Sequence, residues 1–237
     1  MNWKSRTQLL VGEDGVKKLA DSHVLVVGLG GVGAYAAEQL ARAGIGKLTI
    51  VDCDTVNETN KNRQLLALDS TLDRPKVEVM AERIRDINPD VEVIALNQYL
   101  KDQSIIDLME QPFDFVVDAI DTLAPKVFLL YYAVQNKQNI ISCMGAGGKF
   151  DPTKIEIDDI SKSHNCRLAF YIRKRLHRLG IREGITVVFS PEKVAESAVS
   201  IEEATENKIA TVGTISYMPA IFGCFCASHV IRDILSR

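Results

Sequence analysis

A glycine-rich loop is the first segment of the sequence that could carry out chemistry. Residues 28–33 spell Gly-Leu-Gly-Gly-Val-Gly and follow a short apolar segment. Because glycine lacks a side chain, the backbone of such a loop can approach a phosphate closely, and a following helix offers unpaired N–H groups and partial positive charge. The glycines concerned are Gly28, Gly30, Gly31 and Gly33. The segment predicts a nucleotide phosphate site, and the alternative is a turn used only to pack a helix on a strand.

A single acid follows this loop at the spacing expected for a ribose contact. Asp52 lies 19 residues after Gly33, at the end of a second apolar segment. In nucleotide-binding α/β proteins, an acid at this point accepts hydrogen bonds from ribose hydroxyls. Loop and acid together predict a nucleotide, but they do not distinguish NAD from ATP.

Polar residues further along the chain favour ATP. They are Asp54, Asn60, Arg63 and Gln64, followed by Lys76 in an Arg-Pro-Lys triplet. An enzyme that releases pyrophosphate from a triphosphate needs cations and rigid polar donors along the phosphates, whereas hydride transfer does not. Asp118 and Asp121 follow at the carboxyl end of a later apolar segment, where ligands bind in open sheets and an acid can hold Mg²⁺. Taken alone, Asp118 is interpreted as a structural cap.

A parallel sheet is needed to bring these residues to one edge. Apolar segments predict strands at 24–28, 47–52, 91–96, 113–119 and 139–144, and helical spacing predicts helices at 32–43, 75–87 and 124–137. This alternation predicts an α/β fold with a doubly wound, Rossmann-like, mostly parallel sheet and right-handed crossovers.

The pattern changes after about residue 149. We expect an exposed strand at 154–160, an amphipathic helix at 166–179, a strand at 185–189, a mobile glutamate-rich loop at 192–207 and an apolar helix at 215–235. The chain, 1–237, is therefore interpreted as a single domain. It has a nucleotide-binding core at about 20–150 and a C-terminal, substrate-facing elaboration at about 151–237.

Composition and charge restrict the partners and the location. Apolar residues make up 46% and charged residues 25%, as in ordinary soluble proteins, and the net charge is −3. Contact with nucleic acid would therefore need a local basic patch. Nothing near the N-terminus is typical of a signal peptide, and no uninterrupted apolar stretch reaches membrane-spanning length. A cytoplasmic protein without a membrane partner is expected.

The five cysteines predict neither a disulfide framework nor a zinc site. They are scattered, odd in number and form no CxxC pair. Cys53 and Cys143 are predicted to be small core residues. Cys166, at the start of the predicted helix 166–179, is interpreted as an incidental thiol.

The motifs GxGGxG, DxDxVxxxNxNRQ, RPK and DxxD together resemble the ubiquitin-activating-enzyme-like superfamily, which includes bacterial activators of sulfur-carrier proteins. The resemblance covers residues 6–147 and implies ATP-dependent transfer of AMP to a carboxylate. By this resemblance, Asp52 would bind the ribose, with Asp54 beside it in the nucleotide site. Asn60, Arg63 and Lys76 would bind phosphate, with support from Gln64. Asp121 would bind Mg²⁺ or position the reacting groups. Arg6 looks like the arginine that reaches the γ-phosphate in the other subunit, which implies a homodimer.

The C-terminal third is similar to the tRNA threonylcarbamoyladenosine dehydratases. The segments concerned are 142–154, 159–162, 187–190 and 213–220. In that family, ATP activates the threonine carboxylate of a modified adenosine beside the tRNA anticodon. The activated carboxylate then closes onto a nitrogen or oxygen of the same group, and AMP is lost. Because the substrate supplies its own nucleophile, no enzyme cysteine is needed.

A tRNA substrate requires a basic surface, and the predicted helix 166–179 offers one. No acid occurs between residues 167 and 182. The candidate phosphate contacts are Arg167, Arg173, Lys174, Arg175 and Arg178. Leu168, Ile172, Leu176 and Leu179 are expected to form the buried stripe of the helix. A charge run is often only a solvated helix face, so both interpretations remain open.

Three other functions compete with this one. The first is adenylation of the C-terminal carboxylate of a ubiquitin-like or sulfur-carrier protein, against which the missing CxxC pairs and the basic helix count. The second is a nicotinamide dehydrogenase, in which Arg63, Lys76 and Asp121 would have no role. The third is a nucleotide-binding scaffold without catalysis. Some dehydratases of the resembling family also accept a sulfur-delivery partner through a cysteine, and the sequence does not identify one here.

Overall fold

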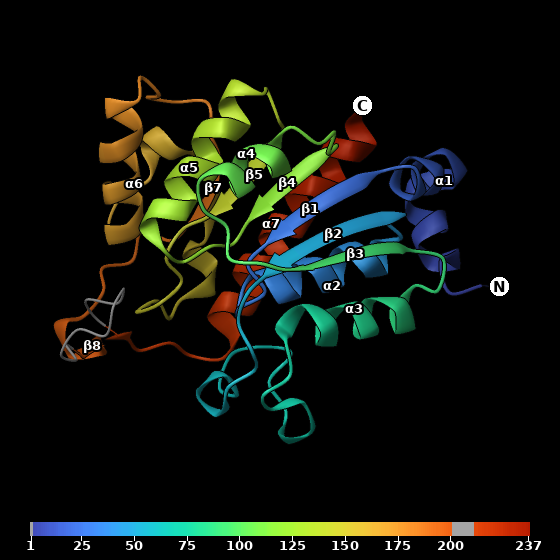
Figure 1. Ribbon diagram of the computed structural model, residues 1–237, viewed down its shortest axis with the longest axis horizontal. Helices are drawn as coiled ribbons and strands as arrows, with labels where there is room; N and C mark the ends of the chain where they lie inside the picture. Colours follow the sequence, from blue (N-terminus) through green and yellow to red (C-terminus); the bar gives the residue numbers. More distant parts are fainter. Residues whose placement is uncertain (1, 201–210) are drawn as a thin grey trace.

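A seven-stranded sheet forms the centre of the computed structural model, which describes residues 2–200 and 211–237 (Figure 1). The strand order is β3-β2-β1-β4-β5-β7-β6, and every pairing is parallel except that of β6 with β7. The strands are β1 His23–Val27, β2 Lys47–Asp52, β3 Glu92–Asn97, β4 Phe115–Asp118, β5 Ile140–Cys143, β6 Glu156–Asp159 and β7 Thr186–Phe189. The chain leaves β1 for β2 on one side and returns to β4 on the other, so a topological switch point lies between β1 and β4.

Helices cover both faces of the sheet. The helices are α1 Ser5–Ala20, α2 Gly33–Ala43, α3 Lys76–Ile87, α4 Gln103–Met109, α5 Leu123–Gln135, α6 Arg167–Arg178 and α7 Tyr217–Ser236. One apolar cluster joins the sheet to α2, α3 and α7, and a second joins it to α4, α5 and α6. The predicted doubly wound α/β fold is confirmed.

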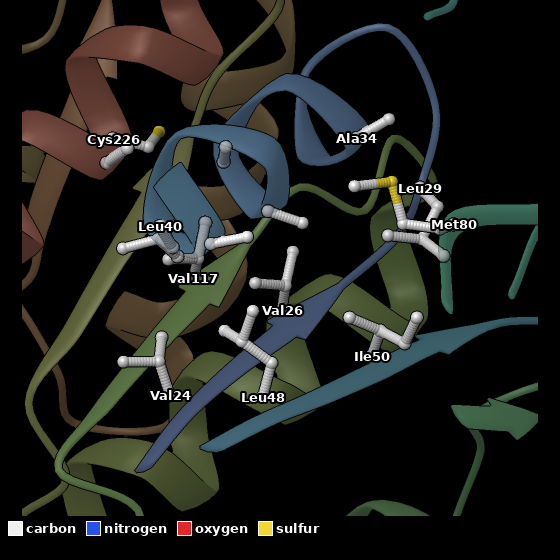
Figure 2. Packing of buried hydrophobic residues seen from close by; sticks show 14 of the residues in the cluster. Val24, Val26, Leu29, Ala34, Leu40, Leu48, Ile50, Met80, Val117 and Cys226 are labelled. Carbon is white, nitrogen blue, oxygen red and sulfur yellow. The ribbon is translucent and has the colours of Figure 1, made fainter. Parts of the chain in front are cut away.

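The central strands are mostly apolar because both of their faces are buried. Successive side chains of a strand point to opposite faces. Val24 and Val26 therefore pack with Leu48 and Ile50 beneath α2 (Figure 2), while Leu25 belongs to the cluster on the opposite face. All five side chains are fully buried. This rigid centre fixes the ends of β1 and β2, where the candidate site residues begin.

Two helices and part of one loop differ from the sequence expectations. Neither α1 nor α4 was predicted, because α1 has few apolar positions at helical spacing and α4 has only seven residues. The predicted loop 192–207 is partly ordered: a 3₁₀ turn, Glu196–Ala198, leads into β8, Val199–Ser200, which pairs with β9, Thr211–Val212. The remainder of that predicted loop, 201–207, lies outside the described residues.

Helix α7 confirms the apolar helix predicted at 215–235, with its start two residues later and its end one residue later. Among the described residues it is the helix that could span a membrane by length and composition alone. Packing explains its composition, because Met218, Phe222 and Val230 are fully buried in the cluster shared with α2. A Cβ at Gly223 would lie only 2.4 Å from the Val32 carbonyl oxygen, so this glycine sets how closely α7 approaches the start of α2. We interpret α7 as a core helix.

Candidate nucleotide-binding site

The glycine loop is a tight connection between β1 and α2. Gly28 has φ +88°, a conformation that side chains other than glycine rarely adopt. A Cβ at Gly33 would lie 1.7 Å from the Gly28 carbonyl oxygen, so this position excludes every other residue. Gly30 is open, since its nearest neighbour would be the Gln64 amide nitrogen at 3.8 Å. The loop therefore presents bare backbone at the start of α2, as phosphate binding requires.

Asp52 lies at the carboxyl end of β2 and is tied to the glycine loop. One carboxylate oxygen accepts a hydrogen bond from the Leu29 N–H at 2.5 Å, and the other accepts one from the Asp54 N–H at 2.8 Å. Burial raises the pKa of Asp52 above its ordinary value, although the positive charge of Lys76 and the Leu29 N–H act in the opposite direction. The side chain is thus held beside the glycine loop, and its contact with a ribose stays a prediction.

Arg63 and Gln64 reach the glycine loop from the long connection after β2. A Cβ at Gly31 would lie 3.4 Å from the Arg63 carbonyl oxygen and 2.9 Å from the Cβ of Pro219 in α7. Gly31 is therefore enclosed between Arg63 and α7. The Arg63 guanidinium donates to the Thr59 carbonyl at 3.0 Å, which directs it within the same connection. Arg63 and Gln64, two of the residues predicted to contact the nucleotide, therefore lie beside the glycine loop.

Lys76 is positioned by an antiparallel β-bridge that joins the two ends of the long connection between β2 and α3. Thr55 forms a bridge with Pro75, and the Lys76 N–H donates to the Asp54 carbonyl at 3.0 Å. The Lys76 Nζ then pairs with the Asp54 carboxylate at 2.8 Å, and the lysine side chain is only 5% exposed. A buried cation at the start of α3 is thereby held next to Asp52, because Asp54 joins the two.

Asn60 has a structural role that the sequence interpretation did not include. Its side-chain oxygen accepts from the Asn57 N–H at 3.1 Å, and the Asn57 side chain caps the short helix Glu58–Asn60 in return. Asn57 thus acts as a turn former. Asn60 keeps an amide NH₂ group for a ligand, so a phosphate contact by Asn60 stays a prediction.

A buried ion pair holds the loop that carries Asp121. Asp118 and Lys126 pair at 2.8 Å with both side chains completely buried. The Asp118 carboxylate also accepts from the Ser142 hydroxyl at 2.6 Å and from the Ile120 N–H at 3.1 Å, while Lys126 donates to the Ile120 carbonyl at 3.0 Å. Asp118 is therefore more than the structural cap expected from sequence. Lys126 was missed, although a lone cation inside the apolar helix α5 is the signal that could have revealed it.

Asp121 is exposed at the same edge of the sheet. The preceding backbone touches the glycine loop, since a Cβ at Gly28 would lie 2.8 Å from the Ala119 carbonyl oxygen and 3.3 Å from the Ile120 nitrogen. An exposed carboxylate beside a phosphate loop suits Mg²⁺, which usually takes one or two protein carboxylates together with phosphate oxygens. The donor present therefore fits the predicted metal role.

Arg6 lies far from the glycine loop of its own chain. Helix α1 is fixed at the amino-terminal edge of the sheet, where Lys4 pairs with Asp90 at 3.7 Å and the Gly46 N–H donates to the Leu19 carbonyl (Figure 1). The loop lies at the opposite edge, one strand length away, and a five-residue strand is about 17 Å long. Arg6 is exposed and does not contribute to the site assembled within one chain.

The cations of α6 divide into two groups. Arg167, Lys174, Arg175 and Arg178 are exposed. Arg173 differs, because its guanidinium is half-buried and donates to the Ser163 carbonyl at 2.6 Å and to the Ser163 hydroxyl. Arg173 therefore anchors the end of the 160–163 turn and is not a fully solvent-exposed cation. Leu179 is also corrected, since it is 43% exposed and lies outside the buried stripe, where Ala169 takes its place.

The cysteines agree only in part with the sequence expectations. Cys143 is buried and its pKa is raised well above the ordinary value by burial and by a contact with Cys226. Cys166 is buried at the N-cap position of α6, where its side chain makes no capping hydrogen bond. The prediction for Cys53 was wrong: it is exposed, because it follows the last residue of β2 at the edge of the sheet.

Fold and site together define a nucleotide-binding α/β enzyme whose phosphate loop is surrounded by cations and acids. The chain belongs to the ThiF family, whose sequence profile matches residues 4–237. It is 39% identical to the tRNA threonylcarbamoyladenosine dehydratase of Bacillus subtilis over 98% of this chain and 94% of that protein.

Solved structures give the same result. The tRNA N6-threonylcarbamoyladenosine dehydratase of Escherichia coli, in complex with ATP, superimposes with a TM-score of 0.90 at 36% identity, covering 98% of this chain and 93% of that one. Its complex with AMP gives a TM-score of 0.89. The sulfur carrier protein ThiS adenylyltransferase of Escherichia coli, in contrast, is 38% identical over only 57% of this chain. Similarity to the dehydratases thus extends through the C-terminal third.

Proposed function

We propose that this chain catalyses the ATP-dependent dehydration of threonylcarbamoyladenosine in tRNA. The observation that carries the proposal is the whole-length similarity to dehydratases, which includes the segments beyond the nucleotide core. The site supports it, because the glycine loop, Arg63, Lys76 and Asp121 meet at one edge of the sheet, at the switch point where ligands bind in such folds.

The proposed reaction has two steps. An oxygen of the threonine carboxylate attacks the α-phosphorus of ATP, forming an acyl-adenylate and releasing pyrophosphate. A nitrogen or oxygen of the same modified group then attacks the acyl carbon, loses its proton and expels AMP. Because both reactants of the second step belong to one group, the protein has mainly to hold them in position and exclude competing water.

Different residues of this chain would contact the phosphates, the ribose and Mg²⁺. Gly28, Gly30, Gly31 and Gly33 leave backbone N–H groups for the phosphates. Asp52 accepts from ribose hydroxyls, and Arg63 and Lys76, with Asn60, offset the negative charge of the phosphates. Asp121 would hold Mg²⁺, which shields phosphate charge when it is bound.

We further propose a homodimer in which Arg6 completes the site of the partner. Arg6 cannot serve its own glycine loop, from which the sheet separates it. Leu9 and Leu10 on the same helix are 84% and 86% exposed, an unusual exposure for two adjacent leucines and one that a subunit contact would cover. We place the protein in the cytoplasm. Any sulfur-delivery partner that docks through a cysteine would meet Cys53, which is exposed.

Mass spectrometry of nucleosides tests the proposed reaction. Purified protein is incubated with ATP, Mg²⁺ and tRNA that carries uncyclised threonylcarbamoyladenosine, and the tRNA is then digested. We expect an ATP-dependent loss of one water from that nucleoside, and none with the Arg63→Ala variant. An unchanged nucleoside would reject the proposal and would direct attention to a carrier protein that ends in Gly-Gly.

A further inference from the structure

The solvent side of α6 carries two aromatic rings among its cations. Phe170 is 53% exposed and Tyr171 is 40% exposed, and their rings meet edge to face with centroids 5.3 Å apart. The opposite side of the helix buries Ala169, Ile172 and Leu176. Large aromatic side chains bury much of their surface in most proteins. Two adjacent rings turned outward therefore point to a ligand that covers them.

Helical spacing places cations on both sides of the rings. Arg167, Tyr171, Lys174 and Arg178 are four, three and four positions apart, so they form one row along the helix, with Phe170 beside it. The Arg167 guanidinium carbon lies 5.9 Å from the centre of the Tyr171 ring. We call these five residues the aromatic–basic ridge. In the described part of the chain, none of its three cations forms an ion pair.

The ridge begins at the edge of the sheet that holds the glycine loop. Cys166 lies at the N-cap position of α6, and a Cβ at Gly145 would lie 3.5 Å from its sulfur. Gly145 follows the carboxyl end of β5, and only β4 separates β5 from β1. The carboxyl ends of parallel strands share one edge, so a substrate at the glycine loop has the start of α6 beside it. From there the helix runs along the outside of α5 (Figure 1).

We propose that the aromatic–basic ridge binds the unpaired anticodon-loop nucleotides next to the modified adenosine. Phe170 and Tyr171 stack on bases, and Arg167, Lys174 and Arg178 contact the flanking phosphates. Unpaired RNA bases stack readily on aromatic rings, and a row of cations follows the backbone. A double-stranded RNA or an acidic protein would contact the three cations but would leave the two aromatic rings without a partner. The inference rests on the proposed tRNA substrate.

Steady-state kinetics of a ring-free variant test the ridge. With Phe170→Ala and Tyr171→Ala combined, we expect the KM for the modified tRNA to rise at least about 30-fold, since each of the two stacked bases contributes about 1–3 kcal/mol. The kcat at saturating tRNA and the KM for ATP should not change. Phe128→Ala is the matched control, because this ring is 44% exposed but lies on α5. An unchanged KM for tRNA, while the wild-type protein dehydrates its substrate, would overturn the inference and leave the proposed function intact.

Fluorescence gives a second readout that does not depend on turnover. Trp3 is the single tryptophan, so Trp3→Phe combined with Phe170→Trp places one reporter on the ridge. Stacking on a base should quench this reporter when an anticodon stem–loop RNA is added, and a blunt RNA duplex of equal length should quench it far less. Equal quenching by both RNAs, or by polyglutamate, would contradict base stacking. A wild-type protein without dehydratase activity would overturn the proposed function and this inference with it.

Discussion

Arg63 and Asp121 approach the glycine loop from different parts of the chain, and neither has a structural partner that explains its position fully. Among the described residues, the Arg63 side chain bonds only to the neighbouring Thr59 carbonyl and the Asn62 side chain, and Asp121 is exposed. Their removal should therefore affect the reaction more than the fold.

We expect Arg63→Ala and Asp121→Ala each to lower AMP formation by at least about 100-fold, a typical loss for one group that stabilises charge in the transition state. Release of AMP and pyrophosphate measures this loss, and circular dichroism checks the fold. Asp107→Ala is the control, because Asp107 is exposed on α4 away from the site. Normal turnover in either site variant would refute the assignment of that residue.

Removal of a residue from the Asp118–Lys126 pair should affect the stability of the fold, because both side chains are buried. Removal of one partner leaves a buried charge without compensation, which costs about 3–5 kcal/mol. Lys126→Met should lower the free energy of unfolding by this amount in urea titrations. It should also weaken activity, since the pair holds the Ile120 backbone that precedes Asp121.

A double variant separates charge from packing. Lys126→Met combined with Asp118→Leu removes both charges and should be more stable than Lys126→Met alone. If the double variant is no more stable than the single one, lost packing or the lost Ser142 and Ile120 hydrogen bonds dominate, and the charge argument fails.

At the scale of elements, Glu38 connects two helices on one face of the sheet. It lies on α2, is 6% exposed, and accepts hydrogen bonds from Arg42 on α2 and Arg83 on α3. Burial alone would raise its pKa, but the bonds from Arg83 and Arg42 outweigh this effect and lower the pKa. The folded state therefore favours ionised Glu38, and this stabilisation is present above the ordinary pKa and lost as pH falls through the lowered one.

We expect Glu38→Gln to lower stability at neutral pH by about 1.5–3 kcal/mol, the range for hydrogen bonds to charged groups. The loss should shrink as pH falls below 4.5, the ordinary pKa of Glu38, because the carboxyl of the unfolded wild-type chain becomes protonated there and that of the folded chain at a still lower pH. Urea unfolding at several pH values measures both effects. An equal difference at every pH would contradict the linkage.

The contact between α2 and α7 depends on a single glycine. A Cβ at Gly223 would meet the Val32 carbonyl at 2.4 Å, and backbone cannot move aside as a flexible side chain can. Gly223→Ala should therefore push α7 away from the glycine loop, cost about 1–3 kcal/mol and weaken ATP binding. Calorimetric titration with ATP and thermal unfolding test this. Ser228→Ala, exposed on the same helix, should change neither.

The extent to which sequence predicts this fold varies between elements for physical reasons. The strand Lys47–Asp52 was predicted without error because its buried middle carries the apolar residues Leu48, Ile50 and Val51. Helix α1 was missed because its exposed surface carries little apolar periodicity. Among site residues, glycines and acids at fixed spacing reveal themselves, whereas the roles of Arg173 and Lys126 depend on tertiary partners that no local pattern contains.

At the scale of the whole molecule, the position of Arg6 makes the proposed dimer testable. An isologous dimer has two equivalent sites, each built from the glycine loop and Arg63 of one subunit and Arg6 of the other. Arg6→Ala and Arg63→Ala homodimers should both be nearly inactive, because every site lacks one arginine.

Mixing the two inactive variants should restore activity. In a heterodimer, the subunit that retains Arg63 receives Arg6 from its partner, so one of two sites is complete, while the other lacks both arginines. If subunits exchange at random, half of the dimers are heterodimers, and activity should return to about a quarter of the wild-type value. Two controls are each variant incubated alone and a mixture without time for exchange. A mixture that stays inactive although mass spectrometry detects heterodimers would show that Arg6 does not act across the interface. Strong activity of Arg6→Ala by itself would show that the site is complete within one chain.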